Sequence, residues 1–385
     1  MSRHGKVRIG FTTGSAATAA AKAGLLFLLQ GRMPSRVDIP CPEGHVRLVL
    51  PIDHLETVES CAGTHAARAT VRKQAGDDPD VTNGALVMAR VHLAPRPLSE
   101  VLIHGERGVG MVTRQGLPVP VGEAAINPGP RRQIRRALME TLEWFGLRAR
   151  VDVYVEVPDG ERLAANTLNP RLGIIGGISI LGTRGTVKPF SHAAWKETIV
   201  QCLDVARAEG VHTAVLTTGG RGQRFLENVL HGLPRSAFIQ VGDHPGFAMR
   251  QAARRGMRRV IWGGFWGKLV KMAQGRPQTH ARLFAVDLAA LGDVVLDCGV
   301  GLDAAGRVAR ANTAREALDI LRETNRFAVA TRAVVSRALD HSRLWVRYPV
   351  DIELILLDYD GCVVHRVAEL GGHERHRVES VTASP

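Results

Sequence analysis

The sequence contains few cysteines, and their spacing is not that of a metal site or of a disulfide framework. The five cysteines, which are Cys41, Cys61, Cys202, Cys298 and Cys362, are odd in number, and no two of them form a Cys-x-x-Cys pair. A zinc site or a set of disulfides is therefore not expected. We expect most of the five to be small buried apolar side chains.

Long apolar runs are also missing. The most apolar stretch, residues 16–29, is too short to cross a bilayer and includes Thr18 and Lys22, so it predicts a buried helix instead. The first residues of the chain lack the apolar run of a signal peptide. With 45% hydrophobic and 23% charged residues, the composition is that of a globular protein. Together these features favour a cytoplasmic enzyme.

Aromatic residues make up only 5% of the chain, and seven of the 50 basic residues are lysines. The net charge of +13 favours an anionic partner, although a compositional bias toward arginine accounts for part of that charge. Nucleic acid is a weak candidate, because the arginines are spread along the chain and no nucleic-acid-reading module is present. An acidic small molecule fits better.

The length of 385 residues and a change in pattern near residues 182–191 predict two domains, 1–188 and 189–385. The first half has short β-like runs at 46–52, 85–93 and 151–157, and helical stretches at 15–30 and 131–145, which predict an α+β domain with substrate-contacting loops. In the second half, strands at 211–217, 237–241 and 259–262 alternate with helices. This alternation predicts an α/β domain with a parallel, Rossmann-like sheet.

The glycine-rich turns of the second half are the best candidates for a cofactor site. Gly219, Gly220 and Gly222 follow a predicted strand and open a helix, and Asp243 ends the next strand, 24 positions after Gly219. In doubly wound folds an acidic residue at about this spacing binds ribose hydroxyls. The glycine fingerprint is incomplete, so a plain strand-to-helix turn remains open. Gly263 and Gly264 form a second such turn.

Two loops of the first half carry groups suited to an anionic ligand. Thr12, Thr13 and Ser15 begin a helix, where hydroxyls and free amides bind anions, with plain helix capping as the alternative. Asn127 precedes a second helix, and Arg131 could contact a carboxylate, unless the loop is simply rigid with surface arginines.

An acidic turn is a candidate for proton transfer. Asp77 and Asp78 lie in a stretch of carboxylates that ends near Asn83, and one aspartate could accept a proton or hold a substrate NH group. A solvated turn is the alternative, because Asp, Pro, Asn and Gly all favour turns.

Two further segments could contact substrate. The glycines around Ser179 and Thr183 allow the backbone to approach either a ligand or a neighbouring strand, and spacing cannot decide between these. Lys268 and Lys271 occupy adjacent positions on a predicted helix and are followed by His280, which suits carboxylate or phosphate capture. A solvated helix face is the alternative.

Taken together, these motifs resemble the cobalt-precorrin-5B carbon-1 methyltransferase family of anaerobic cobalamin biosynthesis. The matching blocks follow the family order over nearly the whole chain: residues 12–17, 75–84, 122–131, 166–185, 267–271 and 279–280. The chain departs from the family pattern at two turns. It has Gly219-Gly220 where Gly-Asn is common, and Gly263-Gly264 or Gly264-Phe265 where Gly-His is common, so roles of that Asn and His are not carried over.

The resemblance implies transfer of a methyl group from S-adenosylmethionine to a ring carbon of an anionic corrin whose cobalt belongs to the substrate. Such a displacement needs alignment of donor and acceptor at about 3 Å and no protein nucleophile or metal. This fits a sequence without a metal or nucleophile signature. A homo-oligomer, or transient handover to other corrin enzymes, stays open, and a nicotinamide-dependent reductase of a corrin is the alternative function.

Overall fold

The computed structural model describes residues 7–59, 65–189, 191–371 and 377–380, so Cys61 lies outside the described part. The chain divides into two compact units, residues 1–191 and 192–385, and each is a mixed α/β structure. Of the four cysteines described, only Cys41 is buried, while Cys362 is exposed. The expectation that most cysteines are buried is therefore wrong.

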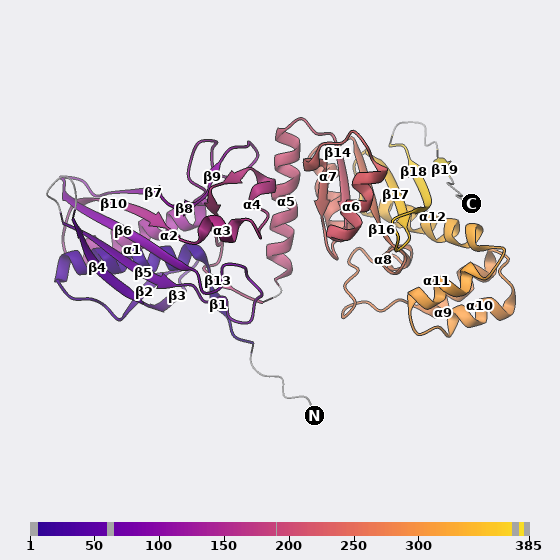
Figure 1. Cartoon of the computed structure of the whole chain (residues 1–385), viewed down its shortest axis with the longest axis horizontal. Helices are drawn as coiled ribbons and strands as arrows, with labels where there is room; N and C mark the ends of the chain where they lie inside the picture. The colour runs from indigo at the N-terminus through magenta and orange to yellow at the C-terminus, as the bar shows by residue number, and fades with distance from the viewer. Residues whose placement is uncertain (1–6, 60–64, 190, 372–376, 381–385) are drawn as a thin grey trace, which may run out of the picture. The chain divides into compact units, whose positions relative to one another are not determined.

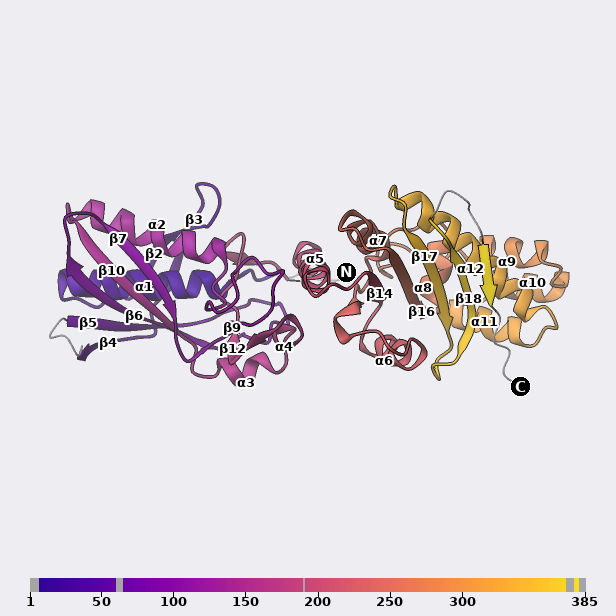
Figure 2. The same cartoon turned by 90° about the horizontal axis from the view of Figure 1, so that it is seen from above.

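Unit 1 is built on a five-stranded sheet with two helices on one face (Figures 1 and 2). The strand order is β4 (His54–Glu59), β5 (His65–Arg72), β6 (Leu86–Pro95), β10 (Ala149–Glu156) and β7 (Glu100–Gly105). All neighbours are antiparallel except β10 and β7. Helices α1 (Thr13–Gln30) and α2 (Pro128–Trp144) pack against each other, α1 on β5 and β6 and α2 on β7. A hairpin of β2 (Arg36–Pro40) and β3 (Arg47–Pro51) lies beside them.

The apolar pattern of the first half explains these elements. In β10, Val151, Val153 and Val155 are buried while the alternate side chains are half-buried, as expected for a strand with one face on the core. Helix α1 is buried from Thr13 to Leu25 and ends where Gly31 adopts a φ of 69°. The predicted buried helix and the strands at 46–52, 85–93 and 151–157 are thus confirmed.

Short strands at one end of the sheet in unit 1 carry the loops. They are β1 (Gly10–Phe11) with β13 (Thr186–Val187), β9 (Met111–Val112) with β11 (Ile174–Ile175), and β8 (Gly108–Val109) with β12 (Gly177–Ile178). In the chain, helices α3 (Gly160–Ala164) and α4 (Asn169–Leu172) lie between β10 and β11. A Cβ on Gly177 would lie 2.2 Å from the carbonyl oxygen of Gly108. The close neighbour of this glycine is therefore another backbone segment.

Unit 2 is built on a six-stranded sheet. Its order is β15 (Phe238–Gln240), β14 (Thr213–Thr217), β16 (Arg259–Phe265), β17 (Asp351–Leu357), β18 (Val363–Glu369) and β19 (Arg377–Ser380). The first four strands are parallel, which confirms the predicted parallel sheet for this part. The last two are antiparallel, so the sheet is mixed, and the sequence analysis did not foresee this edge.

Helices cover the sheet of unit 2 (Figure 1). Helix α6 (Gly220–Val229) packs on β14, β15 and β16. Helices α5 (His192–Ala208), α7 (Pro245–Arg254), α12 (Phe327–Trp345) and α8 (Trp266–Ala273) contact one another in that order, and η1 (Arg235–Ala237) precedes β15. Helices α9 (Leu288–Asp297), α10 (Leu302–Ala309) and α11 (Ala314–Arg322) form a group between α8 and α12 in the chain. Among the described residues, no helix has the length and apolar character that crossing a membrane requires.

The order β15-β14-β16 means that the chain reverses direction across the sheet after β15. In open parallel sheets a crevice forms at such a reversal, outside the carboxyl ends of the two strands between which it occurs. Here these ends are Thr217, followed by the turn at Gly219, and Phe265. The topology therefore singles out the same turns as the glycine pattern did.

We predict that Gly108→Ala is much more destabilising than Gly146→Ala. Both glycines have a positive φ, 74° and 63°, so both variants lose about 1 kcal/mol from backbone strain. A Cβ on Gly108 would also lie 1.8 Å from the carbonyl oxygen of Val157, whereas nothing lies within 4 Å at Gly146. Urea unfolding of both variants measures the difference, and equal losses of unfolding free energy would contradict the packing described here.

Candidate functional site

The start of helix α1 is held by three buried hydroxyls. Thr12 caps the helix by accepting a hydrogen bond from the Ser15 amide at 3.2 Å. The Thr13 hydroxyl accepts from the Leu181 amide at 2.9 Å, and the Ser15 hydroxyl donates to the Gly185 carbonyl at 2.7 Å. The hydroxyls thus tie α1 to residues 181–185, some 170 positions away in the chain. The sequence blocks around Thr12 and Thr183 do come together.

The amides at this helix start are not free for an anion. The Gly14 amide donates to the Leu181 carbonyl at 3.1 Å, and the Ser15 amide is bound by Thr12. These two amides are therefore not free donors. Capping accounts for Thr12, and bonds to residues 181–185 account for the hydroxyls of Thr13 and Ser15. Ser179, also buried, donates to the Asn169 side chain at 3.3 Å. Thr183 is exposed beside this segment.

Asn127 and Arg131 have different surroundings. Asn127 lies at the N-cap of α2, and its side chain makes no capping bond there. The Arg131 guanidinium donates to the carbonyls of Ile126 and Ile103 at 2.9 and 3.3 Å, and pairs with Glu123 at 3.2 Å. Arg131 therefore holds its own loop together, and the expectation that it presents a free fork to a ligand carboxylate is wrong. For the Asn127 side chain, no hydrogen bond is found within the described residues.

The acidic turn is anchored at both ends. Both oxygens of Asp77 accept bonds from Arg8, at 2.8 and 2.9 Å, and these bonds hold the pKa of Asp77 below its ordinary value. A carboxylate with a lowered pKa is a weak proton acceptor, which disfavours Asp77 as a base. Asp78 is half-buried, and the Asn83 side chain accepts from the Ala75 amide at 2.8 Å.

The third carboxylate of this turn has a structural partner that the sequence analysis missed. Lys73 is 2% exposed, and its ammonium donates to Asp80 at 2.6 Å. Burial would raise the pKa of Asp80, but the charge and hydrogen bond of Lys73, with two bonds from Thr82, lower it. Asp80 therefore neutralises a buried cation and fixes the turn that carries Asp77 and Asp78.

In unit 2, packing explains some of the predicted glycines. A Cβ on Gly263 would lie 2.5 Å from Leu226, one on Gly264 2.9 Å from the Trp262 ring, and one on Gly222 2.7 Å from the Thr217 hydroxyl. At these three positions a side chain would displace its neighbour, so packing within the unit favours glycine with or without a ligand. Gly219, in contrast, has an extended φ of 175° and nothing within 4 Å of a built Cβ, and Gly220 meets only Gln240 at 3.7 Å.

Asp243 lies at the centre of a charged cluster next to this turn. Its Oδ1 accepts hydrogen bonds from the Lys268 ammonium and, at 3.2 Å, from the Thr279 hydroxyl. Both Lys268 and Lys271 donate to the Thr279 carbonyl, at 3.2 and 3.1 Å. Burial would raise the pKa of Asp243, but the bond and charge of Lys268 outweigh it and lower that pKa. Burial, followed by Lys268, lowers the pKa of Lys271.

Histidines extend the cluster. His244, 5% exposed, shares a hydrogen bond of 3.2 Å with His192, and the His192 ring lies 5.9 Å from that of His280. Burial first, then the neighbouring His192 and Lys196, lowers the pKa of His244 to about 4, so this side chain is neutral near pH 7. Asp243, Lys268, Lys271 and His280, predicted from separate motifs, are thus brought together. The sequence analysis missed His192 and His244, although His244 directly follows Asp243.

Aromatic side chains were also missed at the carboxyl ends of β16 and β17. Phe265 stacks on Tyr359 with ring centroids 5.3 Å apart. The Arg315 guanidinium lies 4.7 Å from the Tyr359 ring, and Arg221 donates to the Tyr359 carbonyl. A hint existed in the sequence, because Phe265 follows the two glycines of β16, but Tyr359 and Arg315 come close only through the sheet order.

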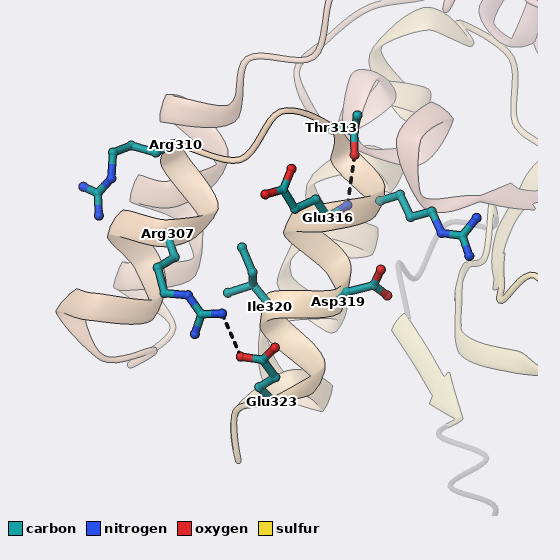
Figure 3. A pocket seen from close by; sticks show the side chains of 8 residues that line it. Arg307, Arg310, Thr313, Glu316, Asp319, Ile320 and Glu323 are labelled. Atoms are coloured by element: carbon teal, nitrogen blue, oxygen red, sulfur yellow. Dashed lines mark hydrogen bonds and ion pairs between the residues drawn. The ribbon is translucent and has the colours of Figure 1, made fainter.

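A depression of about 530 Å³ lies between α10 and α11 (Figure 3). Three arginines and three carboxylates line it, and one pair, Arg307 and Glu323, is joined at 2.9 Å. The balanced charge gives this surface no preference for an anion. None of the predicted site residues lies there.

We predict that Asp80→Asn destabilises the protein by about 3 kcal/mol, because it leaves the buried Lys73 ammonium without a counter-charge. The double variant Lys73→Met with Asp80→Asn should recover most of the loss. Urea unfolding at pH 7 measures both, and a stable single variant would contradict a buried ion pair.

The same pair predicts a dependence on pH. Because folding lowers the pKa of Asp80, its contribution is present above the unfolded value of about 3.9 and is lost as pH falls through the folded pKa. Relative to wild type, the Asp80→Asn protein should lose less stability below pH 4. Parallel acid-denaturation curves would contradict this assignment.

Comparison with known proteins identifies relatives along most of the chain. The CbiD family model matches residues 1–189, and the model of the CbiD C-terminal domain matches residues 278–368. The chain is 44% identical to the cobalt-precorrin-5B C(1)-methyltransferase of Nitratidesulfovibrio vulgaris, covering 92% of this chain and 91% of that protein. It is also 44% identical to the protein of the same name from Geobacillus kaustophilus, with 87% and 88% covered.

Among solved structures, the chain is similar to the cobalamin biosynthesis protein cbiD from Archaeoglobus fulgidus. The two sequences are 29% identical, and the match covers 71% of this chain and 82% of that one, with a TM-score of 0.38.

Proposed function

The chain belongs to the CbiD family, and from this premise we propose that it transfers a methyl group from S-adenosylmethionine to carbon 1 of cobalt-precorrin-5B, giving cobalt-precorrin-6A in anaerobic cobalamin synthesis. The observation that carries this proposal is the identity of 44% to a protein of that named activity, over 92% of the chain. The relatives are named as methyltransferases, which favours this reaction over reduction of a corrin by a nicotinamide.

Unit 2 is the proposed donor-binding domain, with a Rossmann-like use of its parallel strands. The reversal of strand order places the end of β14 and the end of β16 at the position where ligands bind in such sheets. Neither backbone conformation nor packing requires glycine at 219, and Gly220 has almost as much room. A ligand that approaches the backbone closely would account for both residues.

Asp243 is the proposed partner of the donor ribose. Its Oδ1 is already bound by Lys268 and Thr279, and within the described residues Oδ2 accepts no hydrogen bond. The lowered pKa keeps the carboxylate ionised at neutral pH, as an acceptor for hydroxyl donors should be. Lys268 and Thr279 would hold this carboxylate in one orientation.

The cations beside Asp243 are the proposed contacts for the carboxylate arms of the corrin. Lys268 and Lys271 face one carboxylate, so the cluster carries an excess of positive charge even with neutral histidines. The buried Lys271 ammonium, which has three donors, makes one hydrogen bond to the described residues. A substrate carboxylate would balance this charge and use those donors. His280, half-buried at the edge of the cluster, is a further proposed contact.

Unit 1 would contribute through its loops. We propose that three side chains contact substrate directly. They are Asn127, whose side chain makes no capping bond, the exposed Thr183, and Asn83 in the acidic turn. Thr12, Thr13, Ser15, Ser179 and Arg131 would act by holding those loops in place. Proton acceptance during methylation is proposed for the acidic turn that carries Asp77 and Asp78, where the two bonds from Arg8 disfavour Asp77.

The supply of an electrophilic methyl group by the donor explains why no protein nucleophile is needed. What the chain must provide is binding and alignment of two ligands, a task for positioned hydrogen bonds and charges. The cluster around Asp243 and the loops of unit 1 carry positioned hydrogen-bonding and charged groups of this kind.

We predict that the protein binds S-adenosylhomocysteine, the product form of the donor, and that Asp243→Ala weakens this binding at least about tenfold, since charged hydrogen bonds are lost. Asp303→Ala, an exposed aspartate in α10, is the matched control and should bind like wild type. Calorimetric titration measures all three. Unchanged affinity in Asp243→Ala would remove the ribose assignment, and binding of NADPH in place of S-adenosylhomocysteine would favour the reductase.

A further inference from the structure

Helix α5 presents a tryptophan at the turn that carries Asp243. Trp195 is 46% exposed, a high value for so large an apolar side chain. A Cβ on Gly242 would lie 3.0 Å from the indole Nε1. The indole therefore packs against the residue that precedes Asp243, and Gly242, with a φ of 55°, leaves room for it.

Unlike several other aromatic rings of unit 2, the half-exposed Trp195 indole has no ring or cation stacked on it among the described residues. Tyr359 stacks on Phe265 and lies 4.7 Å from the Arg315 guanidinium, and the Phe247 ring lies 5.2 Å from the Lys196 ammonium. His192, one turn before Trp195 on α5, is bonded to His244. Across the described part of the chain, no aromatic or cationic group stacks on Trp195.

The order of the elements indicates where Trp195 lies relative to the proposed donor site. Trp195 at the start of α5 contacts Gly242, and β15 is paired with β14. The start of α5, the Asp243 turn and the Gly219 turn therefore follow one another along the carboxyl edge. A nucleoside whose ribose reaches Asp243 has two directions for its remaining parts. One leads to Gly219 and the reversal of the sheet, and the other leads to Trp195.

We propose that Trp195 is the platform on which the adenine of the methyl donor stacks, with the sulfur end of the donor at the Gly219 turn. This inference rests on the proposed function and specifies its cofactor site. Adenine is a flat, uncharged π-system, and stacking on an indole needs neither a charge nor a new hydrogen bond. The arrangement explains why a large apolar ring stays half-exposed beside the charged cluster around Asp243 rather than packing into the core.

The test is calorimetric titration of the full chain with S-adenosylhomocysteine in four proteins: wild type, Trp195→Ala, Trp195→Phe and Trp144→Ala. Removal of the stacking ring should weaken binding about tenfold in Trp195→Ala, and the aromatic replacement in Trp195→Phe should recover most of it. Trp144, 78% exposed near the end of α2, is the matched control and should have no effect.

The outcomes separate this inference from the function on which it rests. If Trp195→Ala binds S-adenosylhomocysteine as tightly as wild type, the platform is wrong while the donor assignment stands. If wild type does not bind it at all, both fall. Quenching of tryptophan fluorescence by the ligand gives a second readout, for which the conservative variant Trp195→Phe is sufficient. The quenching should disappear in Trp195→Phe and persist in Trp144→Phe, and the reverse pattern would overturn the proposal.

Discussion

The parallel pairing of β15, β14, β16 and β17 is the constraint on which the proposed donor site depends. Because parallel strands end at the same edge, it collects residues from four separate turns, including Gly219, Asp243, Phe265 and Tyr359. The reversal of order after β15 then opens one position at that edge. Without this pairing, the charged cluster would have no relation to the glycine turn.

Within unit 1 the corresponding constraint is the hydrogen bonding of three hydroxyls at the start of α1. The buried hydroxyls of Thr13 and Ser15 join residues near the beginning of the unit to residues near its end. Buried hydroxyls of this kind must be bonded, so they fix one arrangement of the loops that carry Asn127 and Thr183. Thr13 and Ser15, which were predicted to contact a ligand, thus hold the loops in place instead.

Periodic patterns in the sequence were enough to predict α1, β10 and three of the four parallel strands, β14, β15 and β16, because burial leaves a direct trace in residue order. The fourth, β17, was not predicted. The antiparallel strands β18 and β19 leave no comparable signal, since direction is set by pairing. At the site, Asp243 and Lys268 stand out by type and spacing. The roles of Arg131 and Asp80 could not be predicted, because Ile103 and Lys73 become their partners only after folding.

The most direct test of the account is turnover of cobalt-precorrin-5B by the purified chain with S-adenosylmethionine that carries a deuterated methyl group. We expect a corrin product with one labelled methyl group at carbon 1, together with one S-adenosylhomocysteine for each corrin converted. A corrin that returns unlabelled, or a label at another ring position, would contradict it.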